Sequence, residues 1–576
     1  MITSRSLSLD TGGRGNLISL TLSYACLLGG LLTVVLAAYV VVRCYLPLPW
    51  SDGWIEIFMG ARHEPIPSLH YLWQQHNEHR FLVPRLFLVV DLLGFAATQR
   101  FLLASIFVIQ LLHTGLLSWA MRVLGRLENN AWRAGTGLAA FCLFCPTQWE
   151  NLVWGFQTCF VLPPFMATLA MIGLLLYRKN GRRLWIAISI AASGVAAFSL
   201  ASGLIILPLL LLAAALLGLK RSVVLTYVVA AIAISVMFFH NYTMPPPNSN
   251  PFFTIRAPAH LTVYLVTYLG SSWTHDGMAT AQFAGFIGLA LAAIVVLLTL
   301  RSSEPSPASA LFLFLLVFCA ATAFLTSLGR SMSGYEQAFT SRYQTVALLF
   351  WLSLGCLVLI RAGDSSRESR IVVQVIFVIV LLRAAWLAHF TLRDAWEHAF
   401  QERAVAAALA SGVPDRAQLE WAYKNQAEIL ALVPYMREQR ISIFHDDYEP
   451  EMGSVLDASG SVGGEDCRSA VQSISVIGDQ EEPSYRIMGW VWDAKREATA
   501  REIVSISGSK IVGVGATGDW RPQIRAVNPY LKTSFVGFTA YARPAIRGDV
   551  VTLYAVMKRE PLHTCEIATI QDGKVQ

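Results

Sequence analysis

Charged residues are scarce in this chain. Of its 576 residues 14% are charged and 55% are hydrophobic, whereas soluble proteins carry roughly 25% charged residues. The mean hydropathy is +0.51. The deficit is uneven, because residues 17–392 contain repeated apolar runs and residues 393–576 have the composition of soluble protein. A single soluble domain is therefore excluded. The net charge of +6 sits mostly in short loop clusters, so we expect no nucleic-acid partner.

Several familiar motifs are missing as well. No small-residue cleavage site follows the first apolar run, 17–42, and this run is too long for a secretory signal core, so we expect a signal anchor. No CxxC pairs with a second CxxC, which argues against a structural zinc site. Seven of the nine cysteines lie in or beside apolar runs, where cysteine serves as a small hydrophobe.

The apolar runs predict about eleven membrane-spanning helices. We place them at 17–43, 101–121, 134–146, 158–177, 184–200, 203–219, 222–240, 282–300, 310–327, 343–360 and 371–390. With this assignment the basic loop clusters all fall on one face, which the positive-inside rule identifies as the cytoplasm. The basic residues are Arg5, Arg14, Arg122, Arg126, Arg133, Arg178, Lys179, Arg182, Arg183, Lys220, Arg221, Arg301, Arg361, Arg367 and Arg370.

Residues 81–97 test this assignment. They are apolar but contain Pro84, Arg85 and Asp91, and a full crossing here would move every later basic cluster outside. We therefore expect an interfacial helix. The N-terminus is then cytoplasmic, and everything after about residue 391 is exported. For a bacterial chain this means a multi-pass protein of the inner membrane with a periplasmic or extracellular C-terminal part.

The exported part divides in two. Residues 393–440 are expected to be helical with a break at 412–414, and 450–466 reads as a Gly- and Ser-rich linker. From 467 onward short alternating runs such as SYRIMGWVWD and DVVTLYAV predict an all-β sandwich. The expected domains are a transmembrane domain, 1–392, an exported helical segment and linker, 393–466, and a β-sandwich domain, 467–576.

The first outside loop concentrates groups that could do chemistry. Candidate carboxylates are Asp52, Glu56 and Glu78, and beside the last are His76, His79 and Arg80 in the sequence HNEHR. Solvated loop residues would look similar one by one, but their concentration beside the bilayer favours function. Histidine and glutamate also ligate metals. HNEHR is not HExxH and no distant third ligand can be named, so we expect hydrogen-bonded histidines and no metal or other cofactor.

Two later outside loops add further candidates. The second loop holds Glu150, Asn151, Trp154 and Gln157, which either face a cavity or lie at headgroup level. The fifth loop holds Arg330, Arg342 and Tyr343. Arginine on the outer face opposes the positive-inside trend, and its planar fork suits a phosphate. The alternative is a structural ion pair of Arg330 or Arg342 with Glu336.

This layout resembles the GT-C superfamily of polytopic glycosyltransferases over about residues 1–400. Asp52 in PWSDGW occupies the place of the acid found early in that family's first external loop, and Glu56 follows four residues later. The segments WQQHNEHRFLVPRL, PTQWENLVWGFQ and GRSMSGYEQAFTSRY look like those of a group of largely uncharacterised bacterial membrane proteins. The C-terminal GWVWD, RPQI and VGF resemble small β-sandwich modules attached to cell-envelope glycosyltransferases.

The resemblance implies transfer of a sugar from a polyprenyl-phosphate-linked donor to an envelope glycan or lipid acceptor, with inversion at the anomeric carbon. A carboxylate would act as general base, and arginine would neutralise the departing lipid phosphate. The absence of a glycine-rich nucleotide loop fits such a donor. Three alternatives stay open: a lipid-linked glycan ligase or polymerase, a flippase-type transporter, and a non-catalytic envelope scaffold. Membrane lipids are partners in every case.

The two remaining cysteines flank the C-terminal domain. Cys467 opens it and Cys565 lies in its closing segment, on the face where oxidising conditions permit disulfides. First and last strands of a sandwich are often neighbours, so these residues could come within the Cα separation of roughly 4.4–6.8 Å that a disulfide needs. We expect a disulfide between them; the alternative is two buried thiols.

Overall fold

The computed structural model describes residues 11–61, 68–244, 255–301, 306–363, 367–445, 452–456, 466–478, 484–544, 546, 548–558 and 563–576. Most of the expected linker, 450–466, and the N-terminal Arg5 lie outside these ranges. The chain forms two compact units. The first comprises 1–43, 67–87 and 102–392, and the second comprises 44–66, 88–101 and 393–576. The second unit thus joins part of the first outside loop to the C-terminal residues.

The chain is mainly helical up to residue 439. In chain order its helices are α1 (Thr11–Cys44), α2 (Ile55–Ala61), α3 (Leu69–Trp73), α4 (Leu82–Phe95), α5 (Arg100–Val123), α6 (Asn129–Phe144), α7 (Trp149–Val153), α8 (Thr158–Asn180), α9 (Arg183–Ala197), α10 (Ile206–Leu216), α11 (Arg221–Phe239), α13 (Pro258–Gly270), α14 (Met278–Leu300), α15 (Pro307–Arg330), α16 (Gln344–Gly363), α17 (Arg367–Ala410), α18 (Arg416–Leu419), α19 (Gln426–Gln439) and α20 (Pro522–Val527).

Within the described ranges, eight helices are long and apolar enough to cross a membrane. They are α1, α5, α8, α11, α14, α15, α16 and α17, so the chain is a multi-pass membrane protein. The other three expected spans form the shorter helices α6, α9 and α10, of 16, 15 and 11 residues. Sixteen residues rise about 24 Å, less than the roughly 30 Å hydrocarbon core, so the count of eleven stays a prediction.

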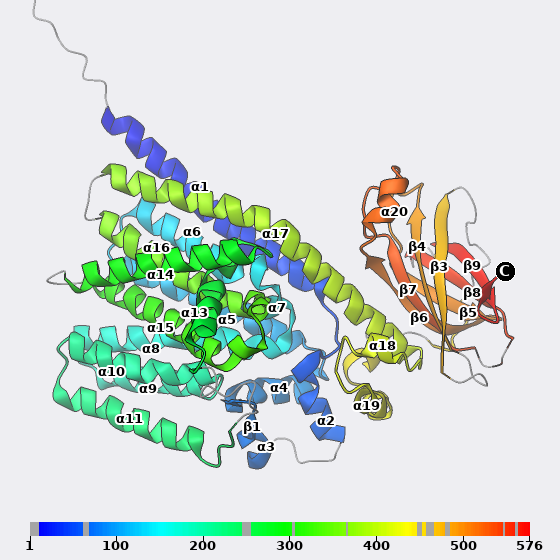
Figure 1. Ribbon diagram of the computed structural model, residues 1–576, viewed down its shortest axis with the longest axis horizontal. Helices are drawn as coiled ribbons and strands as arrows, with labels where there is room; N and C mark the ends of the chain where they lie inside the picture. Colours follow the sequence, from blue (N-terminus) through cyan, green and yellow to red (C-terminus); the bar gives the residue numbers. More distant parts are fainter. Residues whose placement is uncertain are drawn as a thin grey trace, which may run out of the picture. The chain divides into compact units, whose positions relative to one another are not determined.

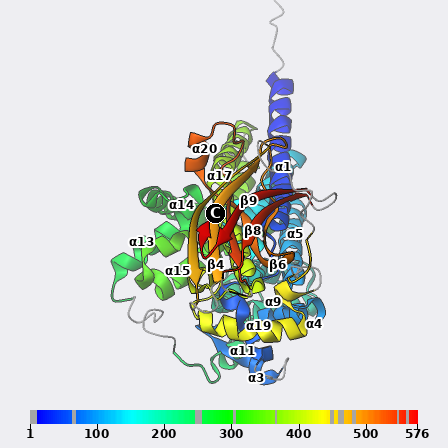
Figure 2. The same cartoon turned by 90° about the vertical axis from the view of Figure 1, so that its right-hand side faces the viewer.

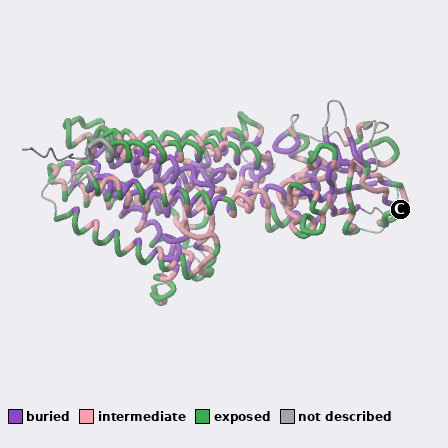
Figure 3. Tube along the Cα trace, turned by 90° about the horizontal axis from the view of Figure 1, so that it is seen from above, coloured by how far each residue is buried: buried purple, intermediate pink, exposed green. Residues whose placement is uncertain are grey.

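The helices of the first unit pack around one large apolar core. Figure 1 shows α1 running beside the first part of α17, and Figure 3 shows buried positions facing inward along the bundle while the outer faces of its helices are exposed. Helices α1 and α6 meet at Gly30 and Gly137, where an added Cβ on either glycine would clash with the opposite backbone. Small residues permit such close crossings in membranes.

One local expectation agrees with the structure and two differ from it. Residues 81–97 do form a helix, α4, whose 14 residues are too few for a crossing. The segment 258–270, expected as loop, is the helix α13. The last span and the exported helix, expected separately, form one 44-residue helix, α17, because no glycine or proline interrupts 391–410. This helix ends before Gly412, whose φ of +68° terminates it.

The C-terminal strands form one antiparallel sheet in the order β10-β9-β8-β5-β6-β7-β4-β3, seen in Figure 2. The strands are β3 (Cys467–Ile477), β4 (Ser484–Asp493), β5 (Glu502–Ser507), β6 (Lys510–Asp519), β7 (Gly537–Ala542), β8 (Val551–Lys558), β9 (His563–Gln571) and β10 (Lys574–Val575). The main apolar core of this domain lies against the sheet, and smaller apolar clusters pack on its strands as well. The all-β character is confirmed, whereas a division into two packed sheets stays a prediction.

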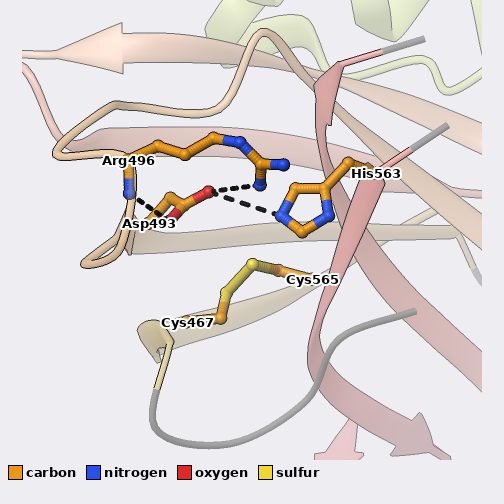
Figure 4. Close-up of a disulfide and its surroundings, with 5 residues drawn as sticks. All are labelled: Cys467, Asp493, Arg496, His563 and Cys565. Atoms are coloured by element: carbon orange, nitrogen blue, oxygen red, sulfur yellow. Dashed lines mark hydrogen bonds and ion pairs between the residues drawn. A yellow bond between two sulfur atoms is a disulfide. The ribbon is translucent and has the colours of Figure 1, made fainter. Parts of the chain in front are cut away.

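A disulfide joins the two sides of this sheet. Cys467 on β3 and Cys565 on β9 are bonded with their Cα atoms 5.9 Å apart, which brings the outer strands together like the closing edges of a barrel. Figure 4 shows beside it the buried Asp493, which accepts hydrogen bonds from the backbone and guanidinium of Arg496 and lies 3.4 Å from His563. Burial favours a raised pKa for Asp493, but these partners outweigh it and the pKa is lowered.

Candidate functional site

The HNEHR segment folds as a minimal β-hairpin in the first unit. Strands β1 (Gln75–His76) and β2 (His79–Arg80) pair antiparallel, with His76 opposite His79. Asn77 takes a φ of +49° in the two-residue turn, a conformation that asparagine tolerates better than most residues. The hairpin therefore presents Glu78 at its tip.

Glu78 is bound to an arginine from a distant loop. Its Oε1 accepts a hydrogen bond from Nη2 of Arg330, at the end of α15, over 2.5 Å. Both side chains are only about a quarter exposed, at 23% and 27%. The second carboxylate oxygen, Oε2, is buried and meets no hydrogen-bond donor within the described part of the chain. One oxygen is thus held while the other lacks a donor.

His79 lies beside the Glu78 carboxylate. Its Nδ1 accepts a hydrogen bond from the Ala201 amide over 3.2 Å, which assigns the imidazole hydrogen to Nε2. Nε2 lies 3.5 Å from Oε1 of Glu78. His76 and His79 both stack on Phe81, with ring centroids 4.9 and 5.2 Å away. Among the described residues no cluster of three potential metal ligands occurs.

The Arg80 side chain makes hydrogen bonds to backbone carbonyls. Its guanidinium donates to the carbonyls of Trp73, Phe238 and His240, and the side chain is buried. Burial lowers the pKa of Arg80, although the charge of Tyr242 opposes this effect. These contacts connect the hairpin to the end of α11. The geometry therefore gives Arg80 a positioning role rather than an open phosphate-binding face.

Several hydrogen bonds join the second outside loop to the fifth outside loop and the start of α16. The Glu150 carboxylate accepts a hydrogen bond from the backbone amide of Arg342 over 2.8 Å. The backbone amide of Glu150 donates to the Ser341 hydroxyl over 3.1 Å. The side-chain amide of Asn151 donates to the backbone carbonyl of Arg342 over 2.9 Å and to the Thr345 hydroxyl over 2.8 Å. Glu150 and Asn151 are buried. Their side chains thus fix the backbone that carries Arg342.

Aromatic rings line this region. The Arg342 guanidinium lies 5.7 Å from the Tyr343 ring, and Tyr343 stacks on Tyr268 of α13 at 5.1 Å. Burial raises the pKa of Tyr264, one turn earlier in α13, while the Arg330 charge acts in the opposite direction. The Tyr264 hydroxyl therefore stays protonated at neutral pH. The helix α13 was not predicted from the sequence, although tyrosines four residues apart lie on one face of a helix.

Trp154 and Gln157 belong to the same neighbourhood in different ways. Trp154 stacks on Phe156 at 5.5 Å, and Phe156 meets the Phe81 ring at 5.5 Å, so the second loop packs on the hairpin. Gln157 is fully buried, and neither its amide oxygen nor its nitrogen has a hydrogen-bond partner in the described ranges. A buried amide without a partner is a position where a water or ligand group gains hydrogen bonds.

Asp52 and Glu56 belong to the second unit. Asp52 lies in a 3₁₀ turn, Ser51–Trp54, and Glu56 lies in α2 with only 4% of its surface exposed. Both have polar or electrostatic partners. The expected candidates therefore fall into three groups. The first holds Glu78, His76, His79, Arg80 and Arg330; the second holds Glu150, Asn151, Trp154, Gln157, Arg342 and Tyr343; the third holds Asp52 and Glu56.

No family model, curated protein or solved structure matches the chain. The site must therefore be interpreted from its own residues. In the first unit these are a partly buried carboxylate and the arginine bound to it. One oxygen of this carboxylate has no hydrogen-bond partner among the residues that the structure describes, and buried tyrosines lie nearby. Such a set can accept a proton from a hydroxyl and hold an anionic group.

Proposed function

We propose that this protein is a membrane glycosyltransferase that uses a polyprenyl-phosphate-linked sugar as donor. The acceptor is an envelope glycan or lipid, and transfer takes place on the outer face of a bacterial inner membrane. The observation that carries this proposal is the state of Glu78. One of its oxygens accepts a hydrogen bond from Arg330, and the other is buried without a donor among the described residues.

In this proposal Glu78 acts as the general base. A hydroxyl of the acceptor would donate its hydrogen to Oε2, which supplies the partner that this oxygen lacks. As the proton moves to Glu78, the acceptor oxygen attacks the anomeric carbon of the donor sugar. The bond from that carbon to the phosphate oxygen breaks, and the phosphate leaves with the electron pair. Attack opposite the leaving group inverts the anomeric centre.

In the same proposal Arg330 binds the phosphate that leaves the donor. Negative charge grows on the departing lipid phosphate, and a guanidinium fork matches phosphate oxygens in a bidentate manner. Arg330 binds Glu78, so a donor phosphate that binds Arg330 would compete for these hydrogen bonds and release the carboxylate. Arg342, fixed by Glu150 and Asn151, provides a second positive charge.

Asp52 and Glu56 remain alternative bases within this proposal. The GT-C resemblance favours Asp52, whereas the direct pairing with an arginine favours Glu78. No cofactor is required, because the leaving phosphate is neutralised by arginine. The basic loops support a cytoplasmic N-terminus and a periplasmic β domain.

A deletion strain tests the activity. We expect the lipid-linked donor to accumulate and one sugar to disappear from an envelope glycan or lipid. Wild-type protein should restore the sugar, whereas Glu78→Gln should not, and an Asp52→Ala variant tests the alternative base. Unchanged lipid-linked sugars and unchanged envelope glycans in the deletion strain would contradict the proposed function.

A further inference from the structure

Arg383 is the one arginine well inside an expected membrane span. It lies in α17, 13 residues after Arg370, which pairs with Glu128. Thirteen residues of helix rise about 20 Å, so Arg383 lies beyond the middle of a hydrocarbon core roughly 30 Å thick. Arginine inside a membrane is costly and normally has a partner.

The described residues satisfy only part of the hydrogen-bonding capacity of Arg383. Nη2 of Arg383 donates to the Trp273 carbonyl over 3.2 Å, and the guanidinium lies 4.2 Å from the Trp386 ring centroid. No carboxylate pairs with Arg383 in the described portion of the chain. A guanidinium has five N–H donors, so most of them, and the positive charge, are left for another acceptor.

The turn that supplies the Trp273 carbonyl holds two further hydrogen-bond donors without acceptors in the described part of the chain. Trp273 and Ser272 belong to the 3₁₀ turn Ser271–Trp273 that follows α13. The indole Nε1 of Trp273 and the hydroxyl of Ser272 are buried, and neither has a partner among the residues described. Buried polar groups normally make hydrogen bonds. Arg383 and the turn that it contacts therefore hold a charged guanidinium, an indole N–H and a hydroxyl. The described residues offer these donors too few acceptors.

The position of Trp386 indicates where the missing acceptor comes from. Its side chain is 55% exposed on α17, and this helix face is apolar and faces lipid in a membrane. A ligand that approaches Arg383 past Trp386 therefore comes from the bilayer. It must bring negative charge and several acceptor oxygens, which is the chemistry of a phosphate group on a lipid.

We propose that Arg383, Trp273 and Ser272 form a binding site for a lipid-borne phosphate. This site uses none of the residues of the Glu78–Arg330 pair and does not depend on the proposed transfer reaction. A phospholipid headgroup and a polyprenyl phosphate share this chemistry. The stacked Trp386 ring would keep the guanidinium plane aligned with the phosphate oxygens.

Native mass spectrometry of the purified full-length protein tests this site. The detergent-solubilised protein is delipidated and titrated with phosphatidylglycerol, with polyprenyl phosphate, and with diacylglycerol, which lacks a phosphate. We expect the wild type to bind at least one phosphate lipid in preference to diacylglycerol, and Arg383→Gln to weaken this binding about tenfold or more. Arg370→Gln is the matched control, because it removes an arginine of the same helix that already has a carboxylate partner.

Ser272→Ala keeps the proposal testable if Arg383→Gln does not fold. This change removes one hydroxyl only, and we expect a smaller loss of affinity for the same lipid. Competition between the two phosphate lipids identifies the natural source, since the stronger binder displaces the weaker one. Equal binding of phosphate lipid by wild type, Arg383→Gln and Ser272→Ala would overturn the proposal. So would equal binding of diacylglycerol and the phosphate lipids by the wild type.

Discussion

Glu78 and Arg330 are 252 residues apart in the sequence, and their side chains meet over 2.5 Å. The contact joins the tip of the HNEHR hairpin to the end of α15. Among the several acids and arginines of the outside loops, these two are thus direct hydrogen-bond partners.

Replacing Arg330 by lysine should weaken donor binding. Lysine keeps the charge but cannot form two parallel hydrogen bonds to a phosphate. Loss of one charge-assisted hydrogen bond costs about 1.5–3 kcal/mol, which corresponds to roughly tenfold or more in affinity. Arg342→Lys should act in the same direction. The measurement is the dissociation constant of a polyprenyl-phosphate sugar, with Arg361→Lys at the end of α16 as control. Unchanged affinity in both variants would reduce the two arginines to structural roles.

Replacing Arg80 should affect folding rather than substrate. Its guanidinium donates to three backbone carbonyls and is buried. Arg80→Ala therefore removes charge-assisted hydrogen bonds worth about 1.5–3 kcal/mol each. We expect a lower melting temperature of the solubilised protein, while the folded fraction binds donor normally. A stable Arg80→Ala protein that had lost donor affinity would instead make Arg80 a ligand-binding residue.

The disulfide should stabilise the β domain. Cys467 and Cys565 are separated by 98 residues, and on the chain-entropy model closing a loop of this length contributes about 4–5 kcal/mol. We expect Cys467→Ser, Cys565→Ser and the double variant to lower the midpoint of unfolding of the full-length protein by similar amounts, because the first change already breaks the bond. Additive losses in the double variant, or two alkylatable thiols in the wild type, would contradict this prediction.

The topology predicts opposite signals from two reporter fusions. A fusion at Arg183, in a basic loop, should report the cytoplasm, and one at Gly460, in the expected linker, should report the outside. The physical reason is the retention of basic loops on the cytoplasmic face. Reporters that work only on one side of the membrane give the readout. The same signal at both positions would invalidate the assignment of the spans.

The long helices could be predicted from composition because apolar runs of that length have few alternatives. The pairing of Glu78 with Arg330 could not, since it depends on how distant loops meet. The sequence offered Glu336 as the structural partner of Arg330 or Arg342, but Glu336 is exposed and Arg330 binds Glu78 instead. Closeness in the sequence therefore did not identify the carboxylate partner of Arg330, because the hairpin brings the distant Glu78 into contact with it.

Some secondary structure was also beyond sequence reasoning. The helix α13 has only 13 residues and lies between two apolar spans, where its short apolar pattern is easily assigned to a loop. The strands were easier, because alternating residues mark them. Their joining into one sheet was not, since strand order and closure depend on long-range pairing that alternation does not encode.

The most direct test of the account is sugar transfer by purified protein carrying Glu78→Gln. Glutamine keeps the shape and can still accept a hydrogen bond from Arg330, but it cannot take a proton. We predict that transfer from a polyprenyl-phosphate sugar falls by about 100- to 10,000-fold, with donor affinity and melting temperature close to wild type. Asp52→Asn and Glu56→Gln are measured alongside. Near-normal transfer by Glu78→Gln, with transfer abolished in Asp52→Asn, would show that the base is Asp52 and contradict the role assigned to the Glu78–Arg330 pair.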